Sequence, residues 1–223
     1  MFADPMQDVY HSNAAEENHK APKKPFYEDL WDAREITLDK NCRNTKKVAE
    51  YVKEIKETNT SVFEEAPQGI YPQILLPTKQ PEKSLEKIVN NILTSREYPW
   101  PASSIAILVM GRNDLESLEN QTFHGNIGTA VYDSEKRNEE EVLTQWCSSK
   151  KILVSTIHSF KGLEADIIIL YNFDSKFQSN DEKIDTLAYV GSSRPHGALY
   201  IIPKDSISRA YVESFLQHQD KSL

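Results

Sequence analysis

The sequence predicts an α/β domain in which helices cover both faces of a parallel sheet. Continuous apolar runs at residues 105–110, 152–156 and 167–171 have the composition of strands that are buried on both faces. Segments with apolar residues at helical spacing, such as residues 48–55 and 85–93, alternate with these runs. Strands interleaved with amphipathic helices are typical of α/β folds.

Weaker patterns complete the predicted chain order. We expect further short strands at residues 70–76, 130–132 and 199–202, and further helices near residues 115–118, 139–146 and 207–217. Thr45 stands where it could cap the first helix. Residues 1–30 are polar and irregular, so we expect a tail or linker there and one domain at residues 31–223.

Composition excludes several classes of protein. With 39% hydrophobic and 27% charged residues in 223, the chain is neither disordered nor fibrous. A net charge of −8 gives no overall attraction to nucleic acid, although a local basic channel would still bind phosphates. Cys42 and Cys147 form no CxxC pair, so we expect no metal site and a reduced, cytoplasmic protein. No apolar run is long enough to span a membrane.

The segment Thr-Ile-His-Ser-Phe-Lys-Gly-Leu-Glu at residues 156–164 is the most informative one. It lies between two predicted strands, and α/β proteins bind ligands in loops at the carboxyl ends of their strands. Gly162 would allow a close backbone approach, and Glu164 could accept a hydrogen bond from a ribose hydroxyl. The spacing fits equally well a polar loop whose glutamate caps a helix.

This segment closely resembles the T-x-H-x-x-K-G-L-E motif of UvrD/Rep-type superfamily-one DNA helicases. In that family the motif belongs to the second RecA-like domain, so the resemblance implies a RecA-like fold of the P-loop NTPase type. It also implies that Thr156 and His158 face single-stranded DNA. By the same resemblance, Gly162 and Glu164 lie at the nucleotide, with the glutamate on the ribose.

A second segment, Tyr-Val-Gly-Ser-Ser-Arg at residues 189–194, resembles the family motif Y-V-A-x-[ST]-R-A-R. The resemblance implies that Arg194 is an arginine finger, which would hold γ-phosphate oxygens in the transition state. Without it, an arginine at a helix end is ordinarily solvated or paired with a carboxylate. The second arginine of the family motif is replaced here by His196.

Two further segments resemble motifs of the same family. Residues 38–45 resemble L-x-x-N-[YF]-R-S-T, which would make Arg43 a second phosphate-contacting arginine; helix capping is the ordinary alternative. Residues 4–10 resemble G-D-x-x-Q-x-I-Y at the end of the first RecA-like domain, unless they form a plain turn. There, Gln7 would sense the γ-phosphate and Tyr10 would lie near a base.

The sequence contains no G-x-x-x-x-G-K-[ST] loop and no apolar strand that ends in an Asp-Glu pair. These parts do most of the positioning in phosphoryl transfer. We therefore expect the C-terminal motor half of an ATP-dependent DNA helicase, which is inactive alone. Its expected partners are single-stranded DNA and a first RecA-like domain, which would hold most of the ATP and Mg²⁺. The alternative is a non-catalytic, degenerate helicase-like module that binds single-stranded DNA or a partner protein.

Overall fold

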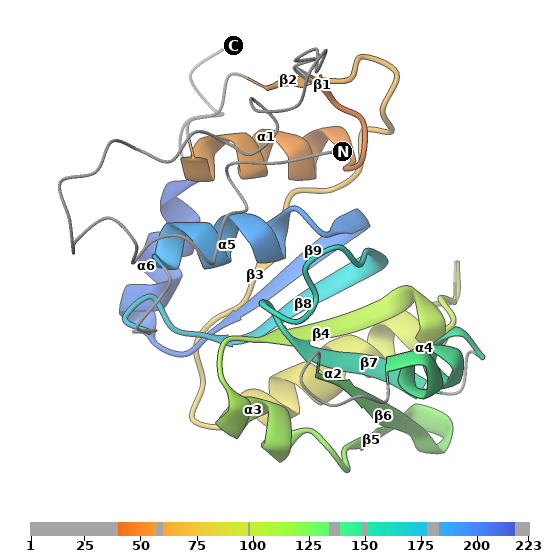
Figure 1. The fold of residues 1–223 in the computed structure, drawn as a ribbon. Coiled ribbons are helices and arrows are strands. Elements are labelled where there is room, and N and C mark those ends of the chain that lie inside the picture. The colour runs from red at the N-terminus through yellow and green to blue at the C-terminus, as the bar shows by residue number, and fades with distance from the viewer. Residues whose placement is uncertain are drawn as a thin grey trace, which may run out of the picture.

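The computed structural model describes residues 40–56, 60–97, 99–133, 139–148, 151–177 and 183–216. Its centre is a seven-stranded sheet with the spatial order β3-β9-β8-β4-β7-β6-β5 (Figure 1). The strands are β3 (Gln73–Ile74), β4 (Ile105–Val109), β5 (Thr122–Phe123), β6 (Ile127–Tyr132), β7 (Lys151–Thr156), β8 (Ala165–Phe173) and β9 (Pro195–Pro203). All neighbours are parallel except β5 and β6.

Helices cover both faces of this sheet, as Figure 1 shows. One face packs against α1 (Lys46–Lys56), α4 (Glu139–Cys147), α5 (Ile184–Ser192) and α6 (Ser206–Ser214). The other face packs against α2 (Pro81–Leu93) and α3 (Arg112–Ser117). Short pieces complete the described chain: β1 (Lys40–Asn41), β2 (Ser61–Val62), and the 3-10 turns η3 (Ala102–Ser104) and η4 (His124–Asn126). The predicted fold class, an α/β domain with helices on both faces of a mainly parallel sheet, is confirmed.

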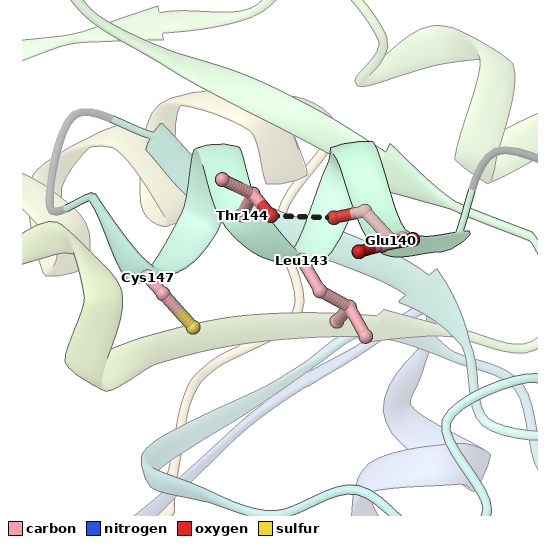
Figure 2. A pocket seen from close by; sticks show the side chains of 4 residues that line it. All are labelled: Glu140, Leu143, Thr144 and Cys147. Atoms are coloured by element: carbon pink, nitrogen blue, oxygen red, sulfur yellow. Dashed lines mark hydrogen bonds between the residues drawn. The ribbon is translucent and has the colours of Figure 1, made fainter.

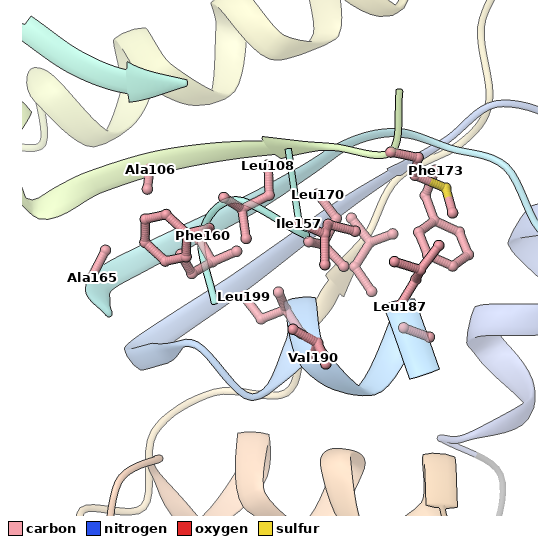
Figure 3. Close-up of a cluster of buried hydrophobic side chains, with 14 of the residues drawn as sticks. Ala106, Leu108, Ile157, Phe160, Ala165, Leu170, Phe173, Leu187, Val190 and Leu199 are labelled. Atoms are coloured by element: carbon pink, nitrogen blue, oxygen red, sulfur yellow. The ribbon is translucent and has the colours of Figure 1, made fainter. Parts of the chain in front are cut away.

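Strand β4 shows why the apolar runs are continuous. Ala106 and Leu108 point into the cluster under α1 and α5, while Ile105, Ile107 and Val109 point into the cluster under α2. A strand with apolar neighbours on both sides has no polar face, so its sequence does not alternate. Figure 3 shows the first cluster, in which Phe160 lies among side chains of β4, β8 and α5.

Parts of the predicted chain order differ from the structure. The strand expected at residues 70–76 is only Gln73–Ile74, because Pro72 and Pro77 flank it and a proline cannot donate to the ladder. The short antiparallel strand β5 was not predicted; it pairs with β6 at the sheet edge. The expected boundary at residue 30, together with Gln7 and Tyr10, lies outside the described residues. No helix in the described part is long and apolar enough to cross a membrane.

Candidate functional site

Three segments that are far apart in the sequence meet at the amino ends of β8 and β9. Glu164 immediately precedes β8, His196 lies at the start of the neighbouring strand β9, and Arg43 lies in the turn before α1. Arg43 Nε lies 2.5 Å from Glu164 Oε1, and His196 Nε2 lies 2.7 Å from Glu164 Oε2. The structure therefore brings together two of the predicted site residues, Arg43 and Glu164, and adds His196 to them.

Asparagine side chains hold the turn that carries Arg43. Asn41 Oδ1 accepts hydrogen bonds from the backbone N–H groups of Arg43 at 3.1 Å and Asn44 at 3.2 Å. Asn44 is buried, and its amide donates to the carbonyl oxygens of Pro195 at 2.5 Å and Ser193 at 3.4 Å. The amide of Asn44 thus ties the turn to the junction between α5 and β9. We did not single out Asn44 from the sequence, where an asparagine before a helix reads as an ordinary cap.

Thr45 stands at the predicted N-cap position of α1, where its carbonyl oxygen accepts from the N–H of Ala49, and it also continues this connection. Its backbone N–H donates to the carbonyl oxygen of His196 at 3.2 Å, and its hydroxyl donates to that of Gly197 at 3.3 Å. The first N–H groups of α1 are satisfied differently, since Lys46 and Lys47 donate to the carbonyl oxygens of residues 67 and 68. The segment before α1 therefore runs against the start of β9.

Positive groups surround the carboxylate of Glu164. Partial burial raises the pKa of this carboxyl, but the hydrogen bond with His196 and the charges of Arg43, His196 and Arg194 outweigh it. The net effect is a pKa below the ordinary value for a glutamate. The charged form of the carboxylate is therefore stabilised by groups from two segments, the turn before α1 and the junction between α5 and β9.

Arg194 lies close enough to act on Glu164, yet it is buried. Only 2% of it is exposed, and its Nε donates to the carbonyl oxygen of Val190 at 3.0 Å. Its own carbonyl oxygen accepts from the N–H of Ala165 at the start of β8. The ordinary alternative of a solvated arginine is therefore wrong, because the side chain folds back over the last turn of α5.

The segment at residues 156–164 runs along the sheet from the carboxyl ends of the strands to their amino ends. Thr156 pairs with Val109 at the carboxyl end of β4, whereas Ile167, three residues after Glu164, pairs with Ile105 at the amino end. At about 3.3 Å per residue, Thr156 and Glu164 are about 20 Å apart along the strands. Only the first half of the segment therefore lies at the carboxyl ends of the strands, because β8 runs parallel to β7 and must start at the opposite end of the sheet.

Buried side chains fix this crossing segment to the sheet. Phe160 is fully buried and packs edge-on against Trp146 with ring centroids 6.5 Å apart, and Ile157 is buried beside it (Figure 3). The hydroxyl of Thr156 accepts from the N–H of Ser159 at 3.0 Å, which closes the first turn. Because the segment leads directly into a strand, the alternative in which its glutamate caps a helix is wrong.

The ends of this segment are more open than its middle. His158 and Thr156 are partly exposed at the carboxyl edge of the sheet. Gly162 has φ 92°, a conformation that other residues rarely adopt, and no atom lies within 4 Å of where a Cβ would stand. A ligand could therefore approach the backbone of Gly162 closely.

A surface hollow among the described residues lies elsewhere. It runs along α4 and is lined by Glu140, Leu143, Thr144 and Cys147, with the hydroxyl of Thr144 donating to the carbonyl oxygen of Glu140 at 2.7 Å (Figure 2). All four residues come from one helix, so we give this hollow no functional weight. Among the described residues, no group of three His, Cys, Asp or Glu side chains could hold a metal ion.

Residues 135–206 match the family model of the UvrD-like helicase C-terminal domain. This part of the chain is therefore similar to UvrD-like helicase C-terminal domains. The match covers about a third of the chain and includes the crossing segment, Arg194 and His196, whereas Arg43 lies before it. The resemblance to UvrD-like helicases that the motifs predict is thereby confirmed over this part of the chain.

The chain is also similar to solved structures. One is the C-terminal domain of a possible DNA helicase from Lactobacillus plantarum WCFS1, at 18% identity and a TM-score of 0.48, over 76% of this chain and 92% of that one. Another is the Hef helicase domain of Pyrococcus furiosus, at 17% identity and a TM-score of 0.43, over 60% of this chain and 28% of that one. These values say nothing about activity. No curated protein sequence matches the chain.

Proposed function

We propose that the chain is the C-terminal motor domain of an ATP-dependent DNA helicase, in which it supplies cationic side chains to ATP and contacts to single-stranded DNA. One observation carries this proposal beyond the family match. Arg43, Glu164 and Arg194 come from three separate segments and meet at the amino ends of β8 and β9. A shared position is what a common ligand requires of them.

In this proposal the nucleotide binds at the amino edge, by which we mean the amino ends of β8 and β9. The guanidinium groups of Arg43 and Arg194 would donate to phosphate oxygens, as planar arginine forks do well. Glu164 would accept from the ribose, and Gly162 would let the nucleotide approach the backbone. Arg194 would have to turn outward from Val190, so we expect closure against the partner domain to expose it.

The opposite edge would contact single-stranded DNA through Thr156 and His158. The crossing segment then links the two ligands, because its buried residues Ile157 and Phe160 move only with the core. A shift of the DNA-facing end would therefore also displace Glu164. Two ligands that bias one packed segment are coupled in free energy.

The chain would need a partner domain to hydrolyse ATP. Its sequence has no phosphate-binding loop and no Asp-Glu pair to hold Mg²⁺, so the first RecA-like domain would provide both. Gln7 and Tyr10 would add a γ-phosphate contact and a base contact from the N-terminal tail. We accordingly expect no ATP turnover from the purified chain. We also expect a cytoplasmic location, as for a protein that acts on DNA.

The deciding experiment substitutes Arg194 in the enzyme assembled with its first RecA-like domain. Arg194→Ala should lower kcat by about 10³-fold and leave the affinity for single-stranded DNA nearly unchanged. Arg209→Ala is the matched control, because Arg209 pairs with Glu213 on α6 and has no proposed role in the reaction. An equal rate for both variants would show that Arg194 is not the finger.

The DNA side can be tested on the chain itself. His158→Ala should weaken binding of a fluorescently labelled single-stranded oligonucleotide, measured by anisotropy, more than it weakens nucleotide binding. His124→Ala serves as the control, since His124 is exposed on the distant turn η4. If His158→Ala weakened nucleotide binding more than DNA binding, the crossing segment would contact the nucleotide and not the DNA.

A second candidate is the non-catalytic, helicase-like module that binds single-stranded DNA or a partner protein. The burial of Arg194 and its bond to Val190 favour it, because a structural arginine would look the same. In that case Arg194→Ala would lower the free energy of unfolding and leave no catalytic rate to change. Measuring stability and ATP turnover on the same variant separates the two functions.

A further inference from the structure

The carboxylate of Glu164 belongs to a chain of polar contacts that runs across the amino edge. Arg43 binds one of its oxygens and His196 the other, at 2.5 and 2.7 Å. The second ring nitrogen of His196 lies 3.8 Å from Asp166 Oδ1, and Asp166 Oδ2 accepts from Ser104 Oγ at 2.7 Å. The contacts thus connect the turn before α1, the end of the crossing segment, β8, β9 and η3.

The atoms used in these contacts decide what each residue can still bind. Arg43 contacts Glu164 through Nε, and its two terminal nitrogens carry the rest of its N–H donors. These nitrogens keep the donors that suit a phosphate. Both ring nitrogens of His196, in contrast, face carboxylates. The Nε2 atom of His196 is thus engaged by Glu164, although His196 stands where the family motif has an arginine.

We propose that His196 is a positioning residue, which fixes the carboxylate of Glu164 and, through it, the guanidinium of Arg43. The proposal rests on the proposed function, because it takes Arg43 as a phosphate-binding group. It also gives Glu164 a second task beside the ribose contact that the family resemblance implies. A carboxylate offers about four lone-pair positions, so two partners orient it and still leave room for a hydroxyl.

A positioning residue is needed because the side chains of Arg43 and Glu164 can adopt many conformations. Arg43 and Glu164 are long side chains, and 38% and 32% of them are exposed. An exposed ion pair between long side chains is weak, because holding both in one geometry costs side-chain entropy. The ring of His196 has fewer rotatable bonds and stands on β9 in the central sheet. A third partner on a rigid strand therefore narrows the range of positions open to Glu164 and Arg43.

The test uses the purified 223-residue chain with inorganic tripolyphosphate, and separately ATP, as titrants followed by amide NMR shifts. His196→Ala should weaken binding of both titrants by the same factor, about fivefold, which is on the order of one lost hydrogen bond. His196→Gln should restore most of it, because a side-chain amide can also donate to Glu164. Arg43→Ala should weaken binding further, and adding His196→Ala to it should change nothing more.

The double variant separates positioning from direct contact. A His196→Ala loss that persists in the Arg43→Ala background would overturn the proposal, since His196 would then act on the anion itself. A loss seen with ATP alone would also overturn it, because Glu164 would then act only on the ribose. No loss with either titrant would overturn it as well. His124→Ala is the control for histidine removal, and the dispersion of the amide spectrum confirms folding of each variant.

Failure of the proposed function would look different. If the unaltered chain shows no shifts at the amino edge with millimolar tripolyphosphate, then no phosphate site exists there and both proposals fall. If the chain binds tripolyphosphate and Arg43→Ala weakens it while His196→Ala does not, the phosphate site stands and only the positioning role is lost.

Discussion

Replacing Asn44 by alanine should lower the free energy of unfolding by about 2–3 kcal/mol. The amide of Asn44 donates to the carbonyl oxygens of Pro195 and Ser193, and its oxygen accepts from Asn41 Nδ2 at 2.8 Å. A protein hydrogen bond contributes about 1 kcal/mol net, and a buried acceptor left without a donor costs about 1–3 kcal/mol. The bond to Ser193 is long at 3.4 Å and adds little, so the bond to Pro195 dominates the sum.

Equilibrium urea unfolding, followed by circular dichroism, measures this loss. The urea concentration at the unfolding midpoint should fall, while the dependence of the unfolding free energy on urea concentration stays unchanged. The melting temperature should drop by about 5–10 °C for a chain of this size. Asn44→Asp should cost more, because a carboxylate would face two carbonyl oxygens. Asn90→Ala is the matched control, since the side chain of Asn90 accepts a single exposed hydrogen bond, from the N–H of His124. A loss for Asn44→Ala below about 0.5 kcal/mol would refute the reasoning, because the buried bonds would then contribute nothing.

Three other substitutions test the surroundings of the site. Phe160→Ala should destabilise the fold by about 3–5 kcal/mol in the same assay, because Phe160 is fully buried; a loss under about 1 kcal/mol would mean that the crossing segment is not anchored there. Gly162→Ala should cost about 1–2 kcal/mol, because alanine is strained at φ 92°, whereas Gly128→Ala, which also meets no atom within 4 Å, should cost less. Burial raises the pKa of Glu164, but its hydrogen bond with His196 and the nearby charges lower it by more. Because the net pKa lies below the ordinary value of 4.5, the carboxylate stabilises the fold at pH values above 4.5. That contribution is lost as the pH falls through the lowered pKa. The difference in unfolding free energy from Glu164→Gln should therefore shrink below about pH 4.5, and a constant difference would contradict the cluster.

The sequence by itself predicted the fold class and most of the elements. Continuous apolar runs identified β4, β7 and β8, because a strand that is buried on both faces has no polar side to interrupt it. Amphipathic spacing identified α1 and α2, since each buries one side, α1 mainly against α5 and α2 against the sheet, and leaves the other in water. The motif of residues 156–164 also identified the helicase family, which the match over residues 135–206 confirms.

Helix α5 shows where pattern reasoning fails. Only its end was expected, because its residues do not form an apolar stripe beside a polar one. The structure explains this, since α5 contacts α1 on one side and β8 on the other, and Thr186, Ala188 and Gly191 are all buried. A helix covered on both sides has no reason to be amphipathic.

Bulges in β8 are a second feature that no local pattern shows. The pairing with β9 shifts register between Ala165 and Ile167 and again between Leu170 and Phe173, where Asn172 has φ 53°. Each shift turns the following side chains to the other face. Phe173 therefore joins the cluster under α5, and strict alternation would have placed it on the opposite face.

The sequence alone determined which side chains are available to this domain, because a motif is a local property of residue type and spacing. Only the tertiary structure decided that Arg43, Glu164 and His196 share one carboxylate while Thr156 lies about 20 Å away at the other edge. The reason is topological. A connection between two parallel strands must return along the length of the strands, from their carboxyl ends to their amino ends. Neighbours in sequence therefore separate, and residues far apart in sequence meet.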